Sequence, residues 1–186
     1  MLMAKVRSAY MPNEVEQNEK AQMPAGIGLS GLWWLWLSAI AIILDQVTKI
    51  WVQNSIEYAS RIEMLPIFNL THVHNYGAAF SILSEAGGWQ RTFLTVLAIA
   101  ISGVLVWWMR QTPKTNVVLG MSYSLILGGA IGNIIDRVAY GYVVDFLHFY
   151  YNDWHFPAFN IADSAITLGA MLLIYDAFTA DKRESE

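Results

Sequence analysis

The sequence contains no cysteine and few charged residues. Asp, Glu, Lys and Arg make up 14% of its 186 residues, well below the roughly 25% that is usual in soluble domains. The absence of cysteine excludes disulfides, thiolate catalysis and zinc sites with cysteine ligands. The sequence has no strongly basic cluster, so it gives no indication of a nucleic acid partner. Hydrophobic residues reach 55%, so we expect an integral membrane protein.

Four long apolar runs are present, at about residues 32–52, 92–109, 117–135 and 158–178. Each is close to the ~20 residues that a helix needs to cross a bilayer. The first run is too long for a signal-peptide core and has no convincing cleavage site after it. We therefore expect a mainly α, polytopic protein with a single four-span domain at residues 29–180, a polar cytoplasmic tail at 1–28 and a short cytoplasmic tail at 181–186.

The distribution of basic residues predicts the orientation of the spans. Seven of the eleven Lys and Arg residues lie in the N-terminal tail, the 110–116 loop and the C-terminus. The positive-inside rule then places both termini in the cytoplasm and the 53–91 and 136–157 segments at the outer face.

The 53–91 segment is too long for a simple connection. Residues 66–73 are rich in β-branched and aromatic side chains, which predicts a strand, and 75–77 (Asn-Tyr-Gly) is typical of a turn. We expect a short amphipathic helix at 78–83. Together these elements predict a small β platform on the outer side of the membrane.

Two carboxylates, Asp145 and Asp163, lie eighteen residues apart at the outer ends of apolar segments. A charge at the centre of a membrane helix costs roughly 2.5–3.5 kcal/mol, so such residues usually have a function. Two carboxylates brought together share a proton, and one can then activate water while the other polarises a carbonyl. The alternative is two separate interfacial acids that reach into water.

Other polar residues lie near the same face. Asn133 and Asp136 share a helix face, and Arg137 follows them with a guanidinium suited to a carboxylate or a carbonyl. The alternative is that these residues only cap the helix end or extend their side chains to water, and for Asp136 we favour this alternative. Asp45 and Lys49 are four residues apart on the first span, where they either brace the site or neutralise each other.

Small residues and histidines have simpler interpretations. Gly128 and Gly132 form a small-xxx-small pattern that predicts close helix packing. The sequence contains four histidines but no His-Glu-x-x-His motif, so we expect surface or interface histidines and neither a metal nor another cofactor. No nucleophile elbow or phosphate-binding loop is present.

Six short motifs occur in order along the spans: Asp45-Gln-Val-Thr-Lys49, Asn75-Tyr-Gly-Ala-Ala-Phe80, Gly128-Gly-Ala-Ile-Gly-Asn133, Asp136-Arg137, Gly141-Tyr-Val-Val-Asp-Phe146 and Phe159-Asn-Ile-Ala-Asp163. In this combination the chain closely resembles bacterial lipoprotein signal peptidase, or signal peptidase II, over about residues 30–178.

The resemblance implies an aspartic endopeptidase of the inner membrane that cuts prolipoproteins before a diacylglyceryl-modified cysteine. It implies that Asp145 and Asp163 are catalytic. The supporting residues that it implies are Asn75, Asn133, Arg137, Asn160, Asp136, Asp45 and Lys49. It also implies an outer strand cradle and inhibition by globomycin-like cyclic peptides. Two features depart from many members: the longer N-terminal tail, and His74 where Arg is common.

Two other functions remain alternatives at this point. A small proton-linked transporter would need charges near the bilayer midplane, usually with repeated halves, and a metalloprotease would lose activity with a chelator. Besides prolipoproteins, we expect membrane lipids as partners, and four spans suffice for a monomer.

Overall fold

The computed structural model describes residues 30–77 and 88–184. The tail expected at 1–28 and the short helix expected at 78–83 lie outside these residues. In the described residues, four helices are long and apolar enough to cross a membrane, at Gly31–Ser55, Trp89–Gln111, Val117–Ala139 and Ile161–Thr179. They confirm the four predicted spans.

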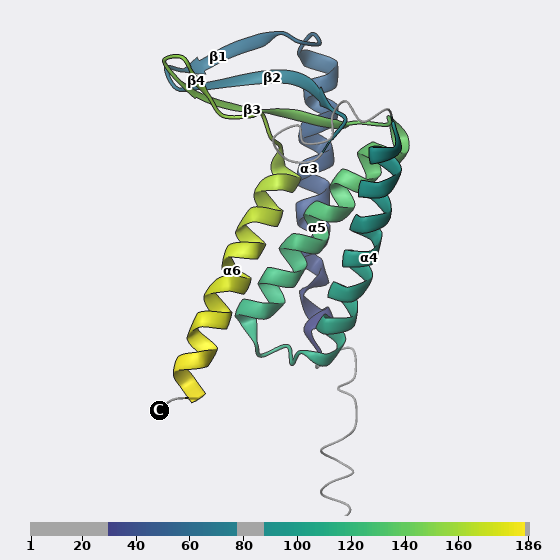
Figure 1. Ribbon diagram of the computed structural model, residues 1–186, viewed down its shortest axis with the longest axis vertical. Helices are drawn as coiled ribbons and strands as arrows, with labels where there is room; N and C mark the ends of the chain where they lie inside the picture. The colour runs from purple at the N-terminus through teal and green to yellow at the C-terminus, as the bar shows by residue number, and fades with distance from the viewer. Residues whose placement is uncertain (1–29, 78–87, 185–186) are drawn as a thin grey trace, which may run out of the picture.

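The first span combines a 3₁₀ turn, η2 (Gly31–Trp34), with helix α3 (Leu35–Ser55). The second and third spans are α4 (Trp89–Gln111) and α5 (Val117–Ala139). The fourth span belongs to α6 (Ile161–Glu184), which runs into the segment expected to be a tail. The four helices lie side by side along the long axis of the molecule, and a small sheet lies across one end (Figure 1).

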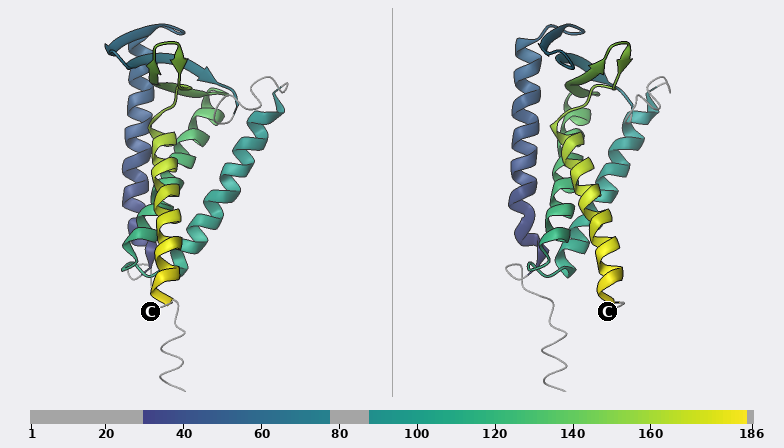
Figure 2. Two further views of the ribbon diagram at one scale, coloured as in Figure 1. Left: turned by 60° about the vertical axis from the view of Figure 1, so that its left-hand side comes forward. Right: turned by 90° about the vertical axis from the view of Figure 1, so that its left-hand side faces the viewer.

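The sheet contains β1 (Arg61–Leu65), β2 (Phe68–Asn75), β3 (Val143–Tyr151) and β4 (Trp154–His155), antiparallel and in the order β1-β2-β3-β4. The β platform predicted in the 53–91 segment is therefore present, but it also includes two strands from the 136–157 segment. Both views in Figure 2 keep the sheet at the same end of the helices.

Helix α5 packs against the other three spans, and glycines allow the close approach to α3 and α6. A Cβ on Gly128 would lie 2.8 Å from the Ala41 Cβ of α3, and a Cβ on Gly129 would meet the Ala162 carbonyl of α6. The prediction that Gly128 and Gly132 mediate packing is confirmed, since a Cβ on Gly132 would lie 2.6 Å from the Asp45 carboxylate of α3.

The ends of α5 follow from local sequence. Its N-cap is Asn116, whose side chain accepts a hydrogen bond from the backbone N–H of Leu119 at 3.3 Å. After Tyr140 the chain passes through Gly141 at a φ of 87°, a left-handed conformation that glycine adopts without steric cost and that commonly ends a helix. The chain then turns directly into β3, which begins at Val143.

Candidate active site

Asp145 and Asp163 reach the same site from different elements. Asp145 lies in β3, opposite Val73 of β2, and Asp163 lies in the first turn of α6. No strand was predicted in the 136–157 segment that carries Asp145; residues Val143–Tyr151 form a strand because their β-branched and aromatic side chains pair with β2.

Asn160 connects the Asp145 carboxylate to the backbone of Asp163. Its Nδ2 donates to Asp145 Oδ1 at 2.7 Å, and its Oδ1 accepts from the Asp163 backbone N–H at 2.9 Å. The second contact caps the N-terminus of α6, where an amide or hydroxyl acceptor is favoured. One buried side chain therefore holds the strand and the helix in a fixed relation.

Each aspartate accepts a further amide hydrogen bond. Asn75 Nδ2 donates to Asp145 Oδ2 at 2.9 Å, and Asn133 Nδ2 donates to Asp163 Oδ1 at 2.8 Å. The predicted residues Asn75, Asn133 and Asn160 thus contact the two carboxylates directly.

Asp145 is only 2% exposed. This burial, together with the negative charge of Asp163, raises the pKa of Asp145 to about 7, although the hydrogen bonds from Asn75 and Asn160 oppose the shift. A carboxyl group with such a pKa exchanges its proton near neutral pH, which suits acid–base chemistry.

A buried charge cluster lies behind the aspartates. Lys49 Nζ contacts Asp45 Oδ2 at 2.8 Å, Asp136 Oδ2 at 3.0 Å and Asn133 Oδ1 at 3.0 Å. The side chains of Lys49, Asp45 and Asp136 are at most 1% exposed. Asp45 and Lys49 were expected either to brace the site or to neutralise each other. They do not neutralise only each other, because Lys49 also forms an ion pair with Asp136.

The cluster joins four elements of the fold. Asp45 Oδ1 of α3 accepts from the Ala162 N–H of α6 at 2.9 Å, and Asp136 Oδ2 of α5 accepts from the Val144 N–H of β3 at 3.0 Å. The interpretation of Asp136 as a solvated capping residue is therefore wrong: it is buried because Lys49 and a strand amide satisfy its carboxylate.

Sequence reasoning missed Gln46, which also belongs to this cluster. Its Nε2 lies 3.1 Å from Asp45 Oδ2 and 3.0 Å from Asp136 Oδ1, and it also donates to the Gly132 carbonyl at 3.2 Å. The only available signal was its place inside the Asp45–Lys49 motif, since a single glutamine in a span has no periodic pattern.

Arg137 lies at the same end of α5. Its Nη2 donates to the Gly77 carbonyl at 3.3 Å, and its Nη1 donates to the Asn133 carbonyl at 3.4 Å. Arg137 therefore links the end of the third span to the segment that follows β2.

A cavity of about 1220 Å³ opens onto both aspartates. Asn75, Asn133 and Arg137 line it beside them, and its remaining wall includes apolar side chains of α4, α5 and α6, among them Leu97, Ile101, Ile126, Ala130 and Ile166. Asp45, Lys49 and Asp136 are not among the described residues that line it. They support the site from behind.

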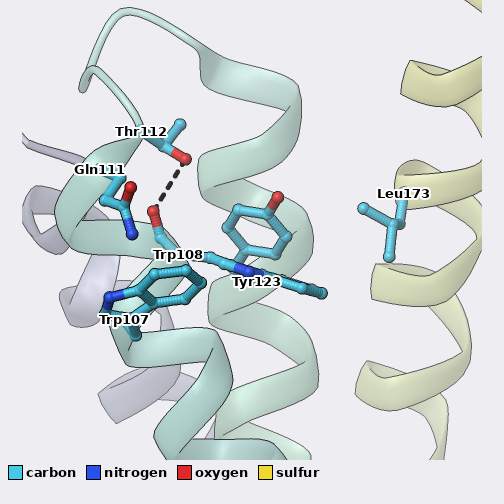
Figure 3. A pocket seen from close by; sticks show the side chains of 6 residues that line it. All are labelled: Trp107, Trp108, Gln111, Thr112, Tyr123 and Leu173. Atoms are coloured by element: carbon cyan, nitrogen blue, oxygen red, sulfur yellow. Dashed lines mark hydrogen bonds between the residues drawn. The ribbon is translucent and has the colours of Figure 1, made fainter.

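A smaller cavity of about 440 Å³ lies between α4, α5 and α6 (Figure 3), near the C-terminal end of α4, which is remote from the sheet (Figure 1). It is lined by Trp107, Trp108, Gln111, Thr112, Tyr123 and Leu173. Since this lining has no carboxylate, imidazole or ammonium group, the cavity is not a candidate for hydrolytic chemistry.

The histidines lie on the sheet and its margin. His72 and His148 are each 6% exposed, so of the expected surface or interface positions the surface position is excluded for these two. His72 Nδ1 is 2.9 Å from the Ile56 carbonyl, and His74 stacks on Tyr142 with ring centroids 3.6 Å apart. Within residues 30–77 and 88–184, no group of three or more His, Asp or Glu side chains is placed to hold a metal ion.

Comparison with known proteins shows the same family throughout. The family model for signal peptidase (SPase) II matches residues 37–179. The lipoprotein signal peptidase of Pseudoalteromonas translucida (strain TAC 125) is 58% identical over 152 residues, which cover 82% of this chain and 92% of the relative. That of Acinetobacter baumannii (strain AB307-0294) is 57% identical over 150 residues, or 81% of this chain and 85% of the relative.

Solved structures agree. A bacterial membrane enzyme with 34% sequence identity superposes with a TM-score of 0.73, covering 82% of this chain and 91% of its own. A second, with 35% identity and a TM-score of 0.68, covers 77% of this chain. None of the comparisons favours a transporter. The chain therefore belongs to the signal peptidase II family, as its six ordered motifs indicated.

Proposed function

We propose that this membrane peptidase is an aspartic endopeptidase in which Asp145 and Asp163 form the catalytic pair. The observation that carries the proposal is that Asp145 and Asp163 line one cavity and are both hydrogen-bonded to Asn160. Two carboxylates held together in a buried site divide the roles of acid and base between them.

The proposed reaction needs one proton on the pair. With its pKa of about 7, Asp145 holds that proton below neutral pH and donates a hydrogen bond to the carbonyl oxygen of the scissile bond. Asp163 takes a proton from the water as it attacks the carbonyl carbon, and it returns that proton to the amide nitrogen as the C–N bond breaks, so that the amine leaves and the pair regains its starting protons. The hydrogen bond that Asn133 Nδ2 donates to Asp163 Oδ1 holds the Asp163 carboxylate in place for that role.

The substrate follows from the walls of the cavity and from the relatives, which are named lipoprotein signal peptidases. Apolar side chains of α4, α5 and α6 suit the hydrophobic signal segment of a prolipoprotein, and the acyl chains of its diacylglyceryl cysteine stay in the lipid. We place the enzyme as a monomer in the bacterial inner membrane, with both termini cytoplasmic and the site at the outer face. Globomycin-like cyclic peptides would compete for the same cavity.

Cleavage of a diacylated prolipoprotein peptide tests the catalytic pair. Asp145→Asn and Asp163→Asn each remove a group that acts in the transition state, so kcat should fall by about 10³-fold or more. Asp153→Asn is the matched control, because Asp153 is an exposed acid in the turn between β3 and β4. It should retain wild-type activity.

Two outcomes would contradict the proposal. Wild-type turnover by Asp145→Asn or Asp163→Asn in folded protein excludes that residue as catalytic. Loss of wild-type activity after treatment with a chelator, with recovery on adding a divalent metal, would instead favour a metallopeptidase.

A further inference from the structure

Two buried polar atoms have no hydrogen-bond partner among the described residues: Asn69 Oδ1 and His148 Nδ1. Their side chains are 5% and 6% exposed. Leaving such atoms unpaired costs on the order of 1–3 kcal/mol each, so two in one place require a structural or functional explanation.

The two residues are direct neighbours in the sheet. Asn69 of β2 pairs in register with His148 of β3, and cross-strand partners project to the same face. His148 lines the large cavity, and Asn69 is its cross-strand neighbour but is not among the described residues that line the cavity. The His148 side chain therefore lies at the sheet end of the cavity that contains Asp145 and Asp163, and Asn69 lies next to it in the sheet.

This corner of the cavity has a positive character. Arg61 of β1 and His155 of β4 line it and are exposed. His155 Nδ1 is 3.3 Å from His148 Nε2, and the two rings are parallel with centroids 5.2 Å apart. Burial lowers the pKa of His148, with smaller contributions from Arg61 and His155, and a bound negative group would be attracted to the charge of Arg61.

The spacing of Asp145 and His148 along β3 indicates which part of a substrate would reach His148. Three residues separate Asp145 from His148 on β3, which is about 10 Å at ~3.3 Å per residue. An extended substrate with its scissile bond at Asp145 therefore brings residues two to four beyond that bond to His148. Because the apolar wall suits the signal segment, the polar end of the cavity is left for the mature side of the substrate.

We propose that Arg61, His148 and His155, backed by Asn69, form a subsite for the mature segment of the substrate that selects an acidic side chain. The inference rests on the proposed function and adds to it a preference for an acidic residue in the mature segment. A carboxylate would contact Arg61 and His155. Rotation of the exposed His155 ring away from His148 would free His148 Nε2 for a hydrogen bond with the backbone of the same segment.

A peptide suits this corner better than a free phosphate or a lipid headgroup. Asn69 Oδ1 can only accept a hydrogen bond, so it would repel a phosphate oxygen, whereas it pairs with a peptide N–H. Charge selection comes from Arg61, which is exposed and replaceable without disturbing the buried residues.

The test uses full-length enzyme and diacylated peptides that carry Asp, Asn or Lys at one of the second to fourth residues after the scissile bond. At the selective position, kcat/KM for the Asp peptide should exceed that for the Lys peptide by about threefold to tenfold, as expected for an exposed charge pair. The ratio should shrink in high salt. Arg61→Glu should invert the preference, and His148→Gln should reduce it.

Arg110→Glu is the matched control, since Arg110 is exposed in the last turn of α4 at the opposite end of the molecule. It should keep the wild-type ratio. Equal rates for the three peptides at all positions, or an unchanged ratio in Arg61→Glu, would overturn the subsite. Either result would leave the catalytic pair intact, because that proposal depends only on whether the Asp145 and Asp163 variants cleave a neutral peptide.

Discussion

At the scale of single residues, the site depends on side chains that satisfy several partners at once. Asn160 is fully buried and donates to Asp145 while it accepts from the backbone of Asp163. A carboxylate in place of this amide could not donate, and an apolar residue would leave both partners unpaired. The amide at position 160 is thus required by the geometry of both aspartates.

The pKa of Asp145 leads to a prediction for the pH dependence of cleavage. A carboxyl group with a pKa of about 7 keeps its proton below that pH and loses it above. Since the proposed mechanism needs one proton on the pair, kcat/KM should fall about tenfold per pH unit on the alkaline side, with a midpoint near pH 7. The measurement is kcat/KM for a diacylated peptide between pH 5 and 9.

Asn75 supplies a second arm of this experiment. Its hydrogen bond favours the ionised form of Asp145 and lowers the pKa of that residue. In Asn75→Ala the alkaline midpoint should therefore move to higher pH. A rate that stays constant to pH 9 in the wild type would show that Asp145 does not hold the required proton.

At the scale of elements, the packing of α5 against α3 positions the charge cluster. A Cβ added at Gly132 would lie 2.6 Å from Asp45 Oδ2, which forces the Asp45 carboxylate away from Lys49. We expect Gly132→Ala to lower the free energy of unfolding by about 1–3 kcal/mol, the usual cost of overpacking. Cleavage activity should fall with it, since Lys49 also contacts Asn133.

Gly103→Ala on α4 is the matched control. A Cβ at Gly103 meets no atom within 4 Å, so the substitution should leave packing unchanged and even favour the helix by up to about 1 kcal/mol. Thermal unfolding of both variants in the same detergent provides the comparison. Equal midpoints for Gly132→Ala and wild type would contradict the tight α3–α5 contact.

The elements also show how far sequence patterns extend. The four spans and β2 were predictable because long apolar runs and β-branched segments have a local cause. Strand β3 was not predicted, because its residues do not alternate between polar and apolar: Val143 to Phe146 are buried on both faces. The partners of Asp136 were equally hidden, since Lys49 and the Val144 amide reach it only through tertiary packing.

At the scale of the whole molecule, polar groups and catalytic candidates gather at one end. The sheet lies across one end of the helices (Figure 1); Asp145 belongs to its strand β3, and the charge cluster is bonded to β3 through Asp136 and the Val144 N–H. The opposite end carries the 110–116 loop with two of the basic residues, Arg110 and Lys114. The basic loop and the sheet with Asp145 thus lie at opposite ends of the helices.

This arrangement predicts which end faces the cytoplasm, and the absence of cysteine makes the prediction easy to measure. Thr115→Cys places a single thiol in the loop between α4 and α5, and Asp153→Cys places one in the turn between β3 and β4; both positions are exposed. The positive-inside rule places the basic loop in the cytoplasm. In intact spheroplasts, a membrane-impermeant maleimide should label Asp153→Cys and leave Thr115→Cys unlabelled until the membrane is permeabilised. Labelling of Thr115→Cys in intact spheroplasts, with Asp153→Cys protected, would reverse the orientation and place the aspartates on the cytoplasmic side, away from exported prolipoproteins.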